Sequence, residues 1–184
     1  FLEGARFEAH RRTVLEEFRA ERVRKAAHAG AAYPRRPEAL RERLEAFFAP
    51  PDGPGPIDPA SSDSRVAAIA APHIDLARGG PIYAHAYKAL LEGCRAETFV
   101  VLGTLHQPAA RAFVPTDKDF ATPLGTVACD RPFIAELARR AGLAPSDDEL
   151  AHRSEHSIEF QAVFLRHLYG ASRPVRIAPI LCGP

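Results

Sequence analysis

Short apolar runs alternate with helix-like segments through the centre of the chain, and this alternation constrains the fold more than any other feature. The continuous apolar runs have the length of buried strands and occupy residues 66–71, 98–102 and 175–181. Shorter strand-like stretches lie at 111–115 and 124–129. Apolar residues at helical spacing cover about residues 37–48, 82–92, 131–141 and 155–168. This order predicts an α/β fold in which helices flank a largely parallel or mixed sheet.

The two ends of the chain differ from this central pattern. Residues 1–27 are rich in Arg, Glu and Ala, with apolar residues near helical spacing, which predicts an N-terminal helical extension before an α/β domain over 28–184. Residues 49–64 hold five prolines and two glycines and are expected to form a loop. The chain stops at Pro184 directly after an apolar run, and a buried strand needs further chain to close the fold. We therefore expect a fragment whose fold is incomplete at its C-terminus.

The composition excludes several classes of protein. The chain carries 24 basic and 23 acidic residues, a balance that does not suggest a nucleic-acid surface. No run approaches the roughly 20 apolar residues that a membrane span needs, and no signal peptide opens the chain. The three cysteines have no zinc-binding spacing, so we expect reduced thiols in a cytoplasmic protein.

Two histidines follow predicted strands directly. His73 comes after the run 66–71, and His106 follows the run 98–102 within a few residues. Ligands of open α/β sheets bind at the carboxyl ends of parallel strands, so these imidazoles could converge on one metal ion. The alternative from spacing alone is a pair of ordinary loop histidines.

His156 lies where a helix is predicted to begin, with Ser154 as the expected capping residue. The positive end of the helix dipole disfavours imidazolium, so a neutral His156 could accept a proton as a catalytic acid/base. The alternative is a surface histidine beside a capping serine.

Polar residues after His73 leave further alternatives open. Asp75 either orients His73 through a hydrogen bond or caps the next helix. Arg78 and the amides of Gly79 and Gly80 either bind an anion or belong to a simple turn.

Six segments, in order along the chain, resemble motifs of the MEMO family, the B proteins of the AmmeMemoRadiSam system. They are "HAGAAYP" at 28–34, "IAAPHIDLARGGPIYAHAYKAL" at 69–90, "VVLGTLHQP" at 100–108, "ATPLGTVACD" at 121–130, "EHSIEFQAVFL" at 155–165 and "IAPILCG" at 177–183. Their common order makes the resemblance far more specific than any single motif.

The resemblance implies the fold of class III extradiol dioxygenases and an iron or copper site. It assigns His73 and His106 as metal ligands and His156 to the same pocket. We also expect Asp75, Arg78 and Gln107 to be pocket residues, on their positions beside these histidines. The resemblance also implies a small-molecule or peptide ligand, and radical-SAM and AMMECR-type partner proteins.

The chain departs from the family pattern at two positions near these histidines. Ile74-Asp75-Leu76 lacks the usual tyrosine, and Gln107 stands where the family has a second histidine. The remaining family ligands would lie beyond Pro184. Our leading hypothesis is a metal-dependent dioxygenase or redox protein. The alternatives are a non-catalytic binding module and a metallohydrolase.

Overall fold

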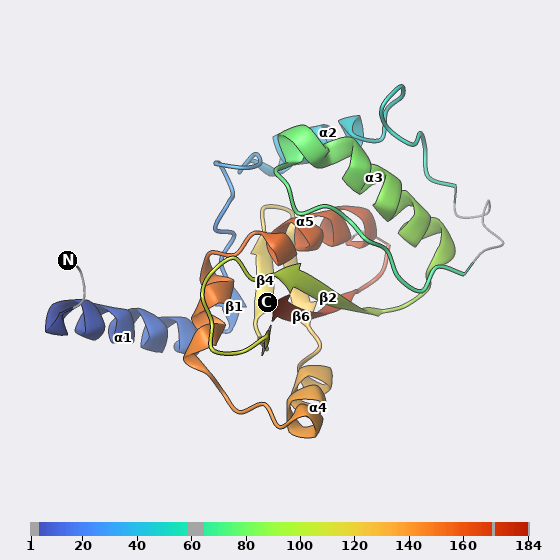
Figure 1. Ribbon diagram of the computed structural model, residues 1–184. Coiled ribbons are helices and arrows are strands. Elements are labelled where there is room, and N and C mark those ends of the chain that lie inside the picture. The colour runs from blue at the N-terminus through green and yellow to red at the C-terminus, as the bar shows by residue number, and fades with distance from the viewer. Residues whose placement is uncertain (1–3, 59–64, 171, 184) are drawn as a thin grey trace.

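The computed structural model describes residues 4–58, 65–170 and 172–183, which form a mixed α/β fold (Figure 1). The strands of the described residues are β1 (Val23–Arg24), β2 (Thr98–Thr104), β3 (Phe113–Pro115), β4 (Asp119–Thr122), β5 (Gly125–Cys129) and β6 (Arg176–Cys182). The helices are α1 (Ala5–Ala20), α2 (Pro37–Ala46), α3 (Leu76–Gly93), α4 (Arg131–Ala141), the 3-10 helix η1 (Asp147–Arg153) and α5 (Ser157–Tyr169). Among these residues, no helix is both long and apolar enough to cross a bilayer.

The described strands join in one six-stranded sheet in the order β1-β4-β5-β6-β2, with β3 also paired to β6. Strand β6 is parallel to β2 and β5, whereas β4 runs antiparallel to β5 and β3 antiparallel to β6. Strand β6 has neighbours on both edges and is buried over most of its length. The apolar run at 175–181 suits this interior position in the sheet. The predicted α/β class with a mixed sheet is confirmed.

Helix α5 forms the centre of the core. It packs against strands β2, β4, β5 and β6 on one face of the sheet, and α2 and α3 pack onto it in turn. The rings of Tyr83 and Tyr87 from α3 stack on Phe164 of α5, with ring centroids 4.9 and 5.0 Å apart. Helix α4 packs on β6, where Ile134 joins a second apolar cluster with Ala178. Because α5 is apolar on nearly all sides, its sequence agrees with this central position.

The predicted strand at 66–71 is wrong. This segment has no regular structure, and the Val66 amide donates to the Gly93 carbonyl at 2.9 Å rather than to a neighbouring strand. In the part of the chain that is described, β2 pairs only with β6, and its residues Val100 and Leu102 are 50% and 67% exposed. The run is apolar enough for a strand, but a strand also needs a hydrogen-bonded neighbour, which the described residues do not supply.

Two other boundaries differ from the sequence predictions. Helix α3 begins at Leu76, earlier than expected, and therefore contains Gly79, Gly80 and Pro81. A Cβ on Gly80 would lie 2.2 Å from Cε1 of Phe47, so the glycine permits close packing between α3 and the end of α2. The predicted loop at 49–64 has no helix or strand over 49–58, and its residues 59–64 lie outside the described residues.

The N-terminal extension consists mainly of α1, which projects from the body of the protein (Figure 1). After it, Val23 and Arg24 already pair with β4, so the chain enters the sheet before residue 28. Arg24 is fully buried, so this short strand is anchored in the core, as are Leu15 and Phe18 near the end of α1.

Candidate metal centre

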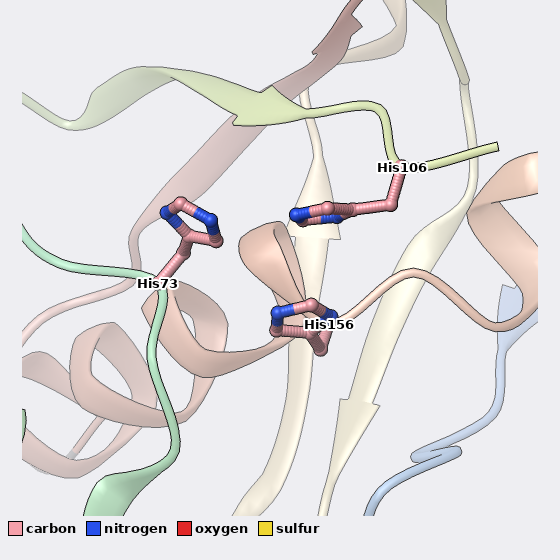
Figure 2. A group of neighbouring side chains, drawn as sticks. All are labelled: His73, His106 and His156. Atoms are coloured by element: carbon pink, nitrogen blue, oxygen red, sulfur yellow. The ribbon is translucent and has the colours of Figure 1, made fainter. Parts of the chain in front are cut away.

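Three imidazoles from three separate segments converge at one point of the molecule (Figure 2). His73 lies in the segment before α3, His106 follows β2, and His156 is the residue at the N-terminal end of α5. The ring centroids of His73 and His106 are 5.2 Å apart, those of His106 and His156 are 4.9 Å apart, and those of His73 and His156 are 5.8 Å apart. One nitrogen from each ring lies within 4.8 Å of the other two. The sequence placed His73 and His106 together, and the structure adds His156 as a third possible donor.

Close packing between β2 and α5 brings His106 and His156 together. Ser157 Oγ donates to the Thr104 carbonyl at 3.0 Å, which ties the first turn of α5 to the end of β2. A Cβ on Gly103 would lie 2.4 Å from Ile158 Cγ1, so a larger residue at this point of β2 would push α5 away. Gly103 is therefore needed for close approach.

A hydrogen-bonded chain through Gln161 anchors the segment that carries His73. Gln161 Nε2 donates to the Pro72 carbonyl at 3.0 Å, and Tyr87 Oη donates to Gln161 Oε1 at 2.9 Å. Gln161 is on α5, one turn after His156, so the same helix positions two of the imidazoles.

The buried carboxylate of Glu155 lies behind the imidazoles. It accepts from the amides of His106, His156 and Ser157 at 3.2, 2.8 and 3.1 Å, and from His106 Nδ1 at 3.0 Å. Burial raises the pKa of Glu155, but these hydrogen bonds outweigh burial and hold its pKa below the ordinary value. Glu155, and not the predicted Ser154, thus satisfies the free amides at the start of α5. Ser154 Oγ instead accepts from Gln107 Nε2 at 2.9 Å.

The imidazole of His156 is held in its neutral form. Burial is the main cause that lowers the pKa of His156. Glu155 raises this pKa, and the neighbouring imidazoles of His106, His28 and His73 lower it further. The predicted neutral state agrees with this direction, although burial rather than the helix dipole is the main cause. A neutral imidazole is the form that binds metal.

Residues that the sequence did not single out support this centre. His28 packs edge-to-face against His156, with ring centroids 5.7 Å apart, and its Nε2 donates to the Ser154 carbonyl at 2.9 Å. Glu159, fully buried, accepts from Arg24 and from the Ala27 and His28 amides. The only sequence signal for His28 was its place in the motif at 28–34.

The other predicted pocket residues have local partners. Asp75 caps α3 by accepting from the Arg78 amide at 3.1 Å, and it also pairs with the Arg78 guanidinium. Of the two alternatives for Asp75, the structure therefore supports the one in which Asp75 caps α3. The Gly79 amide donates to the Asp75 carbonyl at 3.0 Å and is not free for an anion, which disfavours the anion-binding alternative for this pair of glycines. Both glycines lie within α3 rather than in a separate turn. A pocket role for Asp75, Arg78 and Gln107 stays a prediction.

The donor set fits a divalent transition metal. Imidazole nitrogen is a ligand of zinc, copper, iron and nickel, and three histidines with an open position form a known type of catalytic site. Metal–nitrogen bonds of about 2.0–2.1 Å place the donors of a tetrahedral ion roughly 3.4 Å apart, so a spacing within 4.8 Å is close to coordination distance. The cluster found among the described residues contains no carboxylate, unlike the two-histidine, one-carboxylate set of many non-haem iron enzymes.

Comparisons with known proteins agree with the motifs in the sequence. The family model described as Memo-like protein matches residues 24–183. A MEMO1 family protein of Methanopyrus kandleri is 40% identical over 160 residues, which cover 85% of this chain and 55% of the relative. MEMO1 family proteins of Methanocaldococcus jannaschii and Aeropyrum pernix are 34% and 36% identical, over 80% and 87% of this chain and 52% and 57% of their own lengths. The chain thus spans about half the length of these curated relatives. The mixed α/β sheet is consistent with an extradiol-dioxygenase-like fold, and the matches show that the chain belongs to the MEMO family.

Proposed function

We propose that this chain contributes a three-histidine metal site to a metal-dependent MEMO-family protein. The observation that carries the proposal is the convergence of His73, His106 and His156, with one nitrogen of each within 4.8 Å of the others. These side chains come from three segments whose positions are fixed by packing and hydrogen bonds around α5. His156 serves as a ligand in this proposal, beyond the acid/base role expected from the sequence.

Iron or copper is the proposed metal, and oxidation of a small molecule is the proposed reaction class, because the family resemblance implies both. A bound ion would supply Lewis-acid or redox chemistry at the open side of the three imidazoles. The protein contributes three imidazole donors, a buried carboxylate in contact with two of them, and a surface that a ligand can reach, since His73 and His106 are exposed.

Metal binding by the whole chain tests the site directly. Protein stripped with a chelator is titrated with Zn²⁺, Cu²⁺ and, without oxygen, Fe²⁺, and bound metal is measured by elemental analysis and calorimetry. We expect His73→Ala, His106→Ala and His156→Ala each to weaken binding strongly. His10→Ala, an exposed histidine on α1, is the matched control and should bind as the wild type does.

The three variants also separate the two roles of His156. Loss of binding in all three supports a three-histidine site. Retained binding in His156→Ala alone would return His156 to the acid/base role, and undiminished binding in the His73→Ala, His106→Ala double variant would overturn the proposal.

A metallohydrolase is a second candidate, favoured by the all-imidazole donor set, which is typical of zinc sites that activate water. Catechols with Fe²⁺ and oxygen, and activated esters with Zn²⁺, distinguish the two reactions. Ring opening that depends on His73 and His106 supports the oxidative role, whereas ester cleavage with the same dependence supports hydrolysis. Metal binding with neither activity favours a non-catalytic binding module.

A further inference from the structure

Glu155 contacts two of the three imidazoles, each through its Nδ1. Its Oε2 lies 3.0 Å from His106 Nδ1, and its Oε1 lies 3.1 Å from His156 Nδ1. The carboxylate is 4% exposed, so water does not compete freely for these contacts. A single buried carboxylate is therefore placed to act on both rings.

The chemistry of these contacts fixes where the protons lie. Both oxygens of the carboxylate already accept from backbone amides, so they act as acceptors and a ring nitrogen that bonds to them must donate. A bare Nδ1 on His106 would place its lone pair against an oxygen lone pair about 3 Å away. A proton on Nδ1 of His106 removes that repulsion, and in a neutral imidazole the other nitrogen, Nε2, is then bare.

The backbone contacts also fix the carboxylate itself. The amides of His106, His156 and Ser157 hold Glu155 from the end of β2 and from the start of α5. Arg24 Nη2 adds a hydrogen bond to the Glu155 carbonyl at 2.6 Å. Glu155 is thus pinned through both its side chain and its main chain, which leaves it little freedom to follow the rings if they rotate.

We propose that Glu155 is a positioning residue that holds His106 in the Nδ1–H tautomer, with Nε2 of this ring presented to a divalent metal ion. The inference rests on the proposed metal site and deepens it. Histidine ligands commonly donate their second N–H to a carboxylate or carbonyl, and loss of such a partner typically lowers metal affinity about 10- to 100-fold. His73 has no comparable contact with Glu155 among the described hydrogen bonds and ion pairs, so its tautomer should not depend on this residue.

The test uses the full chain with ¹⁵N-labelled histidine and needs no metal for its first measurement. Long-range ¹H–¹⁵N spectra at about pH 8, where ordinary imidazoles are neutral, report which ring nitrogen carries the proton. We expect Nδ1–H for His106 in the wild type and mixed tautomers of this ring in Glu155→Gln. A predominant Nε2–H tautomer of His106 in the wild type would overturn the proposal without any variant, even if Glu155→Gln does not fold.

The second measurement is Zn²⁺ affinity by competition with a chromophoric chelator. We expect Glu155→Gln to bind Zn²⁺ about 10- to 100-fold more weakly, and Glu155→Asp, which keeps the charge, to recover part of the loss. Glu149→Gln is the matched control, since Glu149 accepts from Thr116 Oγ1 at 2.6 Å and has no contact with the imidazoles among the described interactions. Wild-type affinity and wild-type tautomers in a folded Glu155→Gln would contradict the role of Glu155 while leaving the metal site intact. Nδ1–H tautomers that depend on Glu155, in a protein that binds no Zn²⁺, would instead support its positioning of the rings and refute the metal site.

Discussion

Removing Arg24 should destabilise the fold more than almost any other single change of a charged residue. Its side chain is fully buried and donates to the carbonyls of His152, Lys25 and Glu155 at 2.8, 2.9 and 2.6 Å, as well as to the Glu159 carboxylate. In Arg24→Met, the apolar stem is kept but Glu159 stays buried without its counter-charge. Breaking one partner of a buried pair costs about 3–5 kcal/mol, a large share of the roughly 5–15 kcal/mol that stabilises a domain.

The predicted loss can be measured by thermal or urea unfolding. For a chain of this length, each kcal/mol corresponds to about 2–4 °C in Tm, so we expect a drop of roughly 6–20 °C. The sequence contains no tryptophan, so far-UV circular dichroism is the suitable probe. Lys25→Met is the matched control, because Lys25 is 80% exposed and its pair with Glu21 should contribute at most about 1 kcal/mol.

A second variant identifies the uncompensated charge as the cause. Glu159→Gln removes the charge and keeps one oxygen acceptor, enough for one of the Ala27 and His28 amides, which donate to different carboxylate oxygens. Because the unpaired charge is the larger cost, Arg24→Met with Glu159→Gln should be more stable than Arg24→Met alone. If Arg24→Met unfolds within about 1 kcal/mol of the wild type, the buried pair does not stabilise the fold as argued. If the double variant is no more stable than the single one, the cost arises from lost packing or from the orphaned carbonyls instead.

Two further predictions concern stability away from the metal centre. Burial lowers the pKa of His152 from 6.5 to about 4, so between these pH values the unfolded chain binds a proton that the folded chain does not. The free energy of unfolding should therefore fall by about 3 kcal/mol as the pH drops through this window. In urea titrations, His152→Gln should lose that part of the pH dependence. Parallel stability curves for the two proteins would contradict it. Gly80→Ala should cost about 1–3 kcal/mol because its Cβ would lie 2.2 Å from Phe47 Cε1, and Phe47→Leu should relieve part of that cost in the double variant; Gly80→Ala at wild-type Tm would show that the ring moves freely.

The elements that the sequence predicted well are those whose burial is nearly complete. Strand β6 and helix α5 carry long apolar stretches, and such stretches require a central position whatever the neighbours are. The run at 66–71 is also apolar, like β6, but a strand would form there only if it paired with another strand. Local composition contains no information on that partner, so the prediction of a strand was wrong.

The metal centre was predictable only in part, for a related reason. His73 and His106 follow segments recognisable as strand-like runs, and family motifs surround both. Arg24 lies outside these motifs, and Glu155 opens the motif at 155–165, but nothing local to either residue indicates its role, because those roles depend on contacts across 131 and 49 residues of sequence. An acidic residue before a helix is usually interpreted as a favourable charge near the helix dipole. That interpretation predicts neither the burial of the Glu155 carboxylate nor its contact with His106.

Stability and the proposed metal binding should be coupled in this fold because they share polar groups. Arg24 holds the main chain at Glu155, and the Glu155 carboxylate holds His106 and the amide of His156. Strand β1, which carries Arg24, therefore helps to hold the candidate metal centre in place, although it provides no imidazole. It follows that Arg24→Met, measured at a temperature where it is still folded, should bind Zn²⁺ more weakly than Lys25→Met does. Equal affinities would show that the centre is held by α5 and β2 alone.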